Sequence, residues 1–215
     1  MIEIYHKPIT RSIRVVWLCN ELGLSYRLVF VDEGADKADL DAFDRDSVLR
    51  KVPTVSIDGL VMTESGAIVQ QLLEAHEDSL VNRKPGTAER AAFLQWIHGA
   101  ETLSFATSLV AQHAHLRPEN KRVPAMAAEG RQLAFQYFSA LEKELFHRAY
   151  IVGERFSAAD IMVGYTLYIA HLMELFDAQS FPKLTQYFVR ITGRDAFKIT
   201  IEQCVPEDVR SFRPL

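Results

Sequence analysis

The sequence predicts an α/β domain followed by an all-α domain, and three observations lead to this fold class. Short β-branched and aromatic runs alternate with helical patterns over residues 2–75. A polar segment with proline and glycine, from Asn82 to Gly86, then interrupts these patterns as a linker does. After it the strand signals vanish and helical patterns follow one another. We therefore expect domains at residues 1–78 and 87–215, joined by a linker at 79–86.

The first domain should contain four strands and three helices. The helix after the first strand is marked by Val15, Leu18, Cys19 and Leu22, which fall on one helical face, and Gly23 can end it. Residues 36–48 are mostly charged and predict an exposed helix. The expected strands are 2–5, 26–31, 54–57 and 60–62, and a third helix is expected at 64–75. The resulting order, β-α-β-α-β-β-α, is thioredoxin-like.

The second domain should be a bundle of helices. Residues 157–176 are apolar nearly all round, which is typical of a helix at the centre of a bundle. Its start, from Ser157 to Asp160, has the spacing of a capping box, so we assign Asp160 a structural role. The other expected helices are 87–116, 125–146, 183–192 and 195–203.

Composition excludes several classes of protein. The chain has 215 residues, 48% of them hydrophobic and 24% charged, which is ordinary for a soluble globular protein. A net charge of −4 argues against a nucleic-acid partner. No apolar run approaches the length of a membrane span, so no membrane partner is expected. Two cysteines cannot form a disulfide framework, which favours a reducing compartment and a cytoplasmic location.

Two short motifs suggest a binding site for a small zwitterionic peptide. Val52 precedes Pro53 and is therefore expected to be extended, with backbone groups available to a ligand strand. Glu64 and Ser65 stand where a helix begins, and free backbone N–H groups and the positive end of the helix dipole collect there. Together they offer a strand edge beside a pocket for a carboxylate and an ammonium group.

These motifs resemble the glutathione-binding half of the cytosolic glutathione S-transferases. The resemblance runs through nearly the whole chain, in order. It starts with the strand and arginine-rich helix start at 2–24 and continues with the Val-Pro-Thr motif at 52–54 and the Glu-Ser-Gly-Ala-Ile motif at 64–68. It ends with the segment from Tyr150 to Asp160. It is closest to the serine/threonine-type members, which are bacterial or fungal-like, and it implies their fold and activity.

The resemblance also implies where the hydroxyl lies that stabilises the thiolate of glutathione. Aligning Arg14 and the residues after it with the serine-type relatives places Thr10 on their catalytic serine. Ser12, two residues later, is an alternative. Tyr5, at the end of the first strand, is the candidate if the chain is a tyrosine-type member. Thr10 can also simply cap the helix, as threonine commonly does.

The glutathione-binding residues are implied in the same way. Val52 would pair its backbone with the cysteinyl residue, with Pro53 shaping the turn. Lys51 would meet the glycyl carboxylate. Glu64 would face the γ-glutamyl ammonium, and Ser65 would bind the carboxylate beside it. The segment before Lys51 departs from the Asn-Pro-x-Gly common in relatives.

The expected function is a glutathione S-transferase that conjugates glutathione, its co-substrate, to small hydrophobic electrophiles. Such an enzyme would serve detoxification in the cytoplasm as a homodimer and would need no metal. Cys19 lies on an apolar helix face, past the helix start, which disfavours a cysteine-type member. Two alternatives remain, a glutathione-dependent peroxidase or reductase on the same fold and a non-catalytic glutathione-binding regulatory protein.

Overall fold

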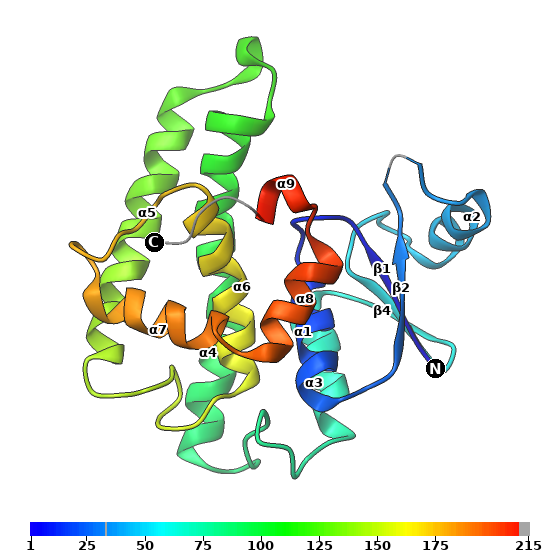
Figure 1. Cartoon of the computed structure of the whole chain (residues 1–215), viewed down its shortest axis with the longest axis horizontal. Helices are drawn as coiled ribbons and strands as arrows, with labels where there is room; N and C mark the ends of the chain where they lie inside the picture. The colour runs from blue at the N-terminus through cyan, green and yellow to red at the C-terminus, as the bar shows by residue number, and fades with distance from the viewer. Residues whose placement is uncertain (33, 211–215) are drawn as a thin grey trace. The chain divides into compact units, whose positions relative to one another are not determined.

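The chain forms two compact units in the computed structural model, which describes residues 1–32 and 34–210 (Figure 1). The first unit comprises residues 1–82 together with the segment that begins at Gly193. The second unit comprises residues 83–192. The fold class expected from the sequence, a thioredoxin-like α/β arrangement and a helical bundle, is confirmed.

The first unit is built on a mixed sheet with the order β2-β1-β3-β4. Its strands are β1 (Ile2–His6), β2 (Tyr26–Phe30), β3 (Thr54–Ile57) and β4 (Leu60–Thr63). β1 is parallel to β2 and antiparallel to β3. β3 and β4 form a hairpin through Asp58 and Gly59, whose φ angles of 50° and 88° are both left-handed. This turn requires positive φ twice, which explains the glycine.

Helices cover both faces of the sheet in the first unit (Figure 1). They are α1 (Ser12–Leu22), α2 (Lys37–Asp46), α3 (Ser65–Glu74), α8 (Asp195–Cys204) and α9 (Glu207–Arg210). Tyr5 and Val29 are buried against Phe43 of α2 on one face. α1 and α3 lie on the other face, where Ile4 and Val55 are fully buried. Because successive residues of a strand point to opposite faces, β1 contributes to both cores.

The helix α8 packs against α1, although nearly the whole chain separates them. The guanidinium of Arg194 makes two hydrogen bonds of 2.6 Å to the carboxylate of Glu21. The rings of Trp17 and Phe197 meet edge to face with centroids 4.7 Å apart. Such bidentate pairs and aromatic contacts fix the helix in one orientation.

The second unit contains only helices. They are α4 (Ala88–Val110), the π-helix η1 (Ala111–Leu116), the short 3₁₀-helix η2 (Glu119–Lys121), α5 (Pro124–Leu145), α6 (Ala158–Leu172) and α7 (Pro182–Thr192). The hydroxyl of Thr87 caps α4 by accepting a hydrogen bond from the N–H of Arg90 at 3.1 Å. The structure thus contains the helix expected at 87–116, and the end of this helix, Ala111–Leu116, is a π-helix.

α6 is the central helix of this unit, as the sequence predicts. Nearly all of its side chains are buried, including that of Asp160. The capping box is present, since the Ser157 side chain accepts from the backbone N–H of Asp160, and the Asp160 carboxylate accepts from the N–H of Ser157 at 2.7 Å. The Ser157 hydroxyl also donates a 2.9 Å hydrogen bond to the same carboxylate. Across the part of the chain that the structure describes, no helix is both long and apolar enough to cross a membrane.

Candidate functional site

The register of the sheet brings three segments to one of its ends. Tyr5 pairs with Thr54, and Thr54 pairs with Thr63. The turn after β1, the segment before β3 and the turn after β4 therefore lie together. These segments contain six of the predicted site residues, namely Thr10, Lys51, Val52, Pro53, Glu64 and Ser65. Residues separated by more than fifty positions in the sequence thus form one candidate site.

Two helices begin at the same end of the sheet. α1 begins at Ser12 and α3 at Ser65, and the free N–H groups at a helix start favour anions. Glu64, which precedes α3, has a left-handed φ of 68°. Strain of this kind in a non-glycine residue is concentrated at functional sites. The backbone at this end is therefore suited to bind a carboxylate or a thiolate.

Two hydroxyl groups lie next to each other at the start of α1. The oxygens of Thr10 and Ser12 are 2.7 Å apart, and the Thr10 hydroxyl also contacts the Lys7 carbonyl at 2.7 Å. Ser12 is fully buried, whereas Thr10 is partly exposed. Thr10 stands one residue before the N-cap, Arg11. Of the two hydroxyls, Thr10 is the one that a ligand can reach.

A buried histidine extends this pair. The Nδ1 atom of His6 lies 2.7 Å from the Ser12 oxygen, and its Nε2 atom lies 3.1 Å from the Cys204 carbonyl at the end of α8. Burial lowers the pKa of His6 to about 4, although the Cys204 carbonyl and the Asp32 carboxylate act in the opposite direction. Sequence reasoning did not identify His6, although a histidine at the end of an apolar strand is a visible signal.

Tyr5 lies on the other face of the sheet from His6. Its hydroxyl donates a 2.9 Å hydrogen bond to Asp46 at the end of α2, and its ring packs against Phe43. Burial, and then the bond to Asp46, raises the pKa of Tyr5 to about 12, so the phenol stays protonated. The structure therefore brings Thr10 and Ser12 together and does not bring the Tyr5 hydroxyl to them.

A buried arginine reaches the start of α3. The guanidinium of Arg14, on α1, donates a 3.0 Å hydrogen bond to the hydroxyl of Ser65. This places a positive charge beside a helix N-terminus, and both favour an anionic ligand group there. Sequence reasoning did not assign Arg14 a role. The available signal was a lone arginine in the otherwise apolar start of α1.

Hydrogen bonds fix the loop before β3. The Ser47 hydroxyl accepts from the Lys51 N–H at 3.2 Å, and the Thr54 hydroxyl lies 2.8 Å from both the Ser47 oxygen and the Lys51 carbonyl. The Val52–Pro53 peptide bond is cis. Val52 is half-buried and Pro53 is buried, so the loop presents a defined backbone at the end of the sheet.

Two charged side chains of the candidate site are exposed. The ammonium of Lys51 and the carboxylate of Glu64 form no ion pair or hydrogen bond within residues 1–32 and 34–210. They can therefore pair with a ligand without breaking an existing contact. A zwitterionic ligand with separate anionic and cationic groups matches this arrangement.

The two cysteines are not part of the site. Cys19 and Cys204 are both buried, and burial raises the pKa of each thiol to about 12. Neither side chain is a thiolate at neutral pH, and only the thiolate is a nucleophile. Among the residues described by the structure, no three histidine, cysteine, aspartate or glutamate side chains cluster in a way that could hold a metal ion.

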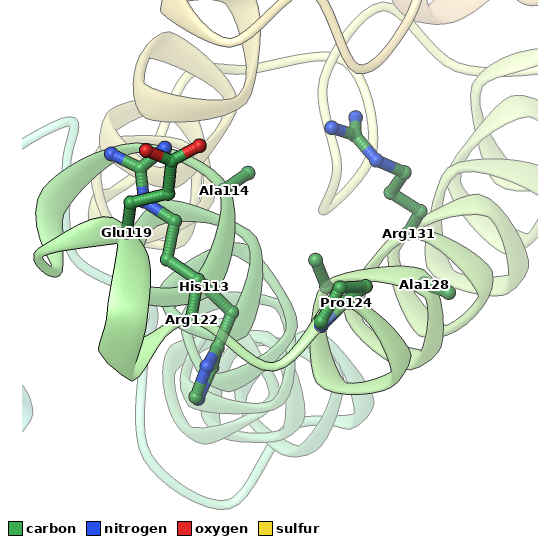
Figure 2. A pocket seen from close by; sticks show the side chains of 8 residues that line it. His113, Ala114, Glu119, Arg122, Pro124, Ala128 and Arg131 are labelled. Carbon is green, nitrogen blue, oxygen red and sulfur yellow. The ribbon is translucent and has the colours of Figure 1, made fainter.

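A cavity of about 460 Å³ lies in the second unit (Figure 2). It is lined by His113, Ala114, Glu119, Arg122, Pro124, Ala127, Ala128 and Arg131, and Figure 2 shows Arg131 apart from Glu119. Arg122 donates hydrogen bonds of 2.8 Å to two carbonyl groups at the end of η1. His113 accepts one of 3.1 Å from the N–H of Val123. These side chains therefore join η1 to α5, which is a structural role.

Comparisons with known proteins give a consistent result. The family models for the N-terminal and the C-terminal domain of glutathione S-transferase match residues 5–80 and 120–190. Glutathione S-transferase 3 of Schizosaccharomyces pombe is 24% identical over 94% of this chain and 88% of that protein. Disulfide-bond oxidoreductase YfcG of Escherichia coli is 28% identical over 91% of this chain and 92% of that protein.

Solved structures of glutathione transferases have the same fold. Ure2p5 from Phanerochaete chrysosporium, cocrystallized with 1-(S-glutathionyl)-2,4-dinitrobenzene, superposes with a TM-score of 0.85. The match covers 99% of this chain and 98% of that chain, at 18% identity. At this identity the likeness concerns the fold.

Proposed function

Because the chain belongs to the cytosolic glutathione S-transferase family, we propose that it transfers the thiolate of glutathione to small hydrophobic electrophiles. The observation that carries this proposal is the end of the sheet where the three segments meet. A reachable hydroxyl and two helix N-termini gather there, with a cation and a carboxylate that have no partner among the described residues. A zwitterionic thiol peptide needs this set of groups.

The reaction requires the thiolate, because a free cysteine thiol titrates near ~8.5 and is mostly protonated at neutral pH. In our proposal the hydroxyl of Thr10 gives up one of its internal contacts and donates a hydrogen bond to the sulfur. A hydrogen bond to the charged form lowers the pKa of the thiol. The start of α1 adds the positive end of its dipole. The thiolate then attacks the electrophile.

The rest of glutathione would be held by the other two segments. Ser65, supported by Arg14, would bind the γ-glutamyl carboxylate, and Glu64 would pair with its ammonium group. The backbone of Val52, shaped by Pro53, would pair with the cysteinyl residue. Lys51 would meet the glycyl carboxylate. Ser12 and Tyr5 do not contact the sulfur in this proposal, because Ser12 is fully buried and the Tyr5 hydroxyl donates to Asp46.

Replacing Thr10 with valine tests this function. The variant keeps the branched shape and loses the hydroxyl, so kcat/KM with glutathione and an aryl halide should fall by about 10- to 100-fold. The ultraviolet absorbance of the bound thiolate should show a higher thiol pKa. Tyr5→Phe is the matched control and should remain close to the original protein. Loss of turnover in Tyr5→Phe, with Thr10→Val unaffected, would show a tyrosine-type site instead.

A glutathione-dependent reductase is the second candidate function, because one relative is a disulfide-bond oxidoreductase. The buried, protonated cysteines make a route through a protein disulfide unfavourable. A reductase would therefore have to oxidise two glutathione molecules to their disulfide. Comparing turnover of a small disulfide or hydroperoxide with that of an aryl halide distinguishes the two functions.

We also infer a homodimer, which would act in cytoplasmic detoxification. Large apolar side chains are exposed in both units, such as Leu49 at 59%, Phe105 at 57% and Phe135 at 57%. Burial of such side chains against a second copy of the chain would remove apolar surface from water. Sedimentation at low micromolar concentration should give twice the chain mass of 24.4 kDa. An active species that sediments as a single chain would contradict the dimer.

A further inference from the structure

The hydrogen positions around His6 follow from its two contacts. The carbonyl oxygen of Cys204 can only accept a hydrogen bond, so the Nε2 atom that faces it at 3.1 Å must carry the hydrogen. The α8 helix, which ends at Cys204, therefore selects the tautomer of a histidine on β1. In the neutral ring the Nδ1 atom is then an acceptor.

The surroundings of His6 keep the ring neutral. The His6 ring is fully buried and meets the Phe30 ring nearly at a right angle, with the ring centroids 5.0 Å apart. α1 presents the Ser12 hydroxyl to the ring, and α8 presents the carbonyl of Cys204. The charge that acts on the ring is the Asp32 carboxylate, but burial outweighs it and the pKa remains near 4. Neutral pH is well above this value.

A neutral ring determines where the hydrogen of Ser12 points. The Ser12 oxygen lies 2.7 Å from Nδ1, and Nδ1 has no hydrogen to give, so Ser12 must donate. A serine hydroxyl has a single hydrogen. Ser12 therefore has only lone pairs to offer to Thr10, which lies 2.7 Å away on its other side.

The hydrogen of Thr10 is thus the one that can be redirected. It faces two acceptors at 2.7 Å, the Ser12 oxygen and the Lys7 carbonyl, and can satisfy only one of them. Whichever it chooses, the other contact lacks a hydrogen. Thr10 is also the partly exposed member of the pair, whereas Ser12 is fully buried. The exposure of Thr10 and the position of its hydrogen therefore both identify it as the hydroxyl that can donate to a ligand.

We propose that His6 is a positioning residue: by accepting the hydrogen of Ser12, it keeps that hydrogen away from Thr10, so that Thr10 donates to the ligand thiolate without receiving a hydrogen bond from Ser12. This inference rests on the proposed function for the identity of the ligand. It adds a residue on β1 and a backbone carbonyl at the end of α8 to the groups that control the thiol. His6 itself does not touch the sulfur.

Nitrogen NMR of the intact protein labelled at histidine tests the arrangement without glutathione. We expect His6 to show a hydrogen on Nε2 and none on Nδ1 at neutral pH. A hydrogen on Nδ1 would overturn the proposal, because Ser12 would then be free to donate to Thr10. This result does not depend on whether glutathione is the substrate.

Variants test the consequence for the thiol, with the pKa of bound glutathione measured by thiolate absorbance. Ser12→Ala should leave this pKa unchanged, because the hydrogen of Ser12 points away from Thr10. His6→Gln, which keeps one acceptor and one donor, should also leave it unchanged. An increase in Ser12→Ala equal to that in Thr10→Val would overturn the proposal.

His6→Leu gives a result that a merely structural role would not produce. Without an acceptor at residue 6, the hydrogen of Ser12 turns to Thr10, which then donates more strongly to the thiolate. The thiol pKa should therefore fall, whereas general damage to the site would raise it and would count against the proposal. If this variant does not fold, the results for Ser12→Ala and His6→Gln decide the proposal.

Failure of the proposed function is recognised separately. If calorimetry detects no glutathione binding, the proposed function fails, and the NMR experiment still decides the orientation of Ser12.

Discussion

Asp160→Ala should lower the free energy of unfolding by about 3 to 5 kcal/mol, a loss at the high end for single substitutions. The carboxylate is completely buried and accepts four hydrogen bonds. Two come from the N–H and hydroxyl of Ser157, one from the N–H of Ile151 at 2.9 Å and one from the hydroxyl of Tyr187 at 2.9 Å. Alanine would leave these buried donors without partners. It would also remove the capping box of α6, the centre of the second unit.

Urea unfolding of the intact protein measures this loss. Glu129→Ala is the matched control, because it removes a carboxylate from an exposed position on α5 in the same unit. It should change the free energy of unfolding by less than about 0.5 kcal/mol. Asp160→Asn should fall between the two, because its amide retains one acceptor oxygen. A loss for Asp160→Ala similar to that of the control would show that the four contacts contribute little.

Acid should destabilise the protein through His6, by about 3 kcal/mol between pH 6.5 and 4. Burial lowers the pKa of this histidine from 6.5 to about 4 in the folded chain. As the pH falls below 6.5, the unfolded chain binds a proton that the folded chain does not yet bind. The contribution of the neutral ring is therefore complete above pH 6.5 and is lost as the pH approaches 4.

The comparison with His6→Gln isolates this contribution, because other groups also titrate in this range. Burial lowers the pKa of His171, which acts in the same direction, and raises that of Asp160, which acts in the opposite direction. The difference in unfolding free energy between the two proteins should shrink as the pH falls from 6.5 to 4. A difference that is independent of pH would mean that His6 is protonated, or exposed, in the folded chain.

Much of the fold could be predicted from the sequence because it depends on local patterns. The helix expected at 195–203 is α8, and the spacing from Ser157 to Asp160 predicted the capping box that the structure shows. The packing of α8 against α1 could not be predicted. An apolar face indicates that a helix is covered, but not which element covers it. The pattern of apolar residues did not indicate the change from α- to π-helix at Ala111.

The candidate site was predictable to the extent that its motifs are local. Each motif was placed on its turn or helix start, but only the strand register shows that the three segments meet. Sequence spacing also left Thr10, Ser12 and Tyr5 as alternatives. The three hydroxyls can be distinguished only by the face to which each side chain points and by the group that it contacts. Tyr5 contacts Asp46, and Ser12 contacts His6. The roles of all these residues in binding and catalysis remain predictions.

The contact between β1 and the end of α8 also has a consequence for synthesis on the ribosome. His6 leaves the ribosome 198 residues before the carbonyl of Cys204 that fixes its tautomer. The second unit, residues 83–192, leaves the ribosome between them and can fold before α8 is available. Until α8 arrives, the Trp17 side of α1 has no cover from Phe197. In the nascent first unit α1 therefore has an uncovered apolar face. The hydroxyls of Thr10 and Ser12 take their final orientation only when α8 docks.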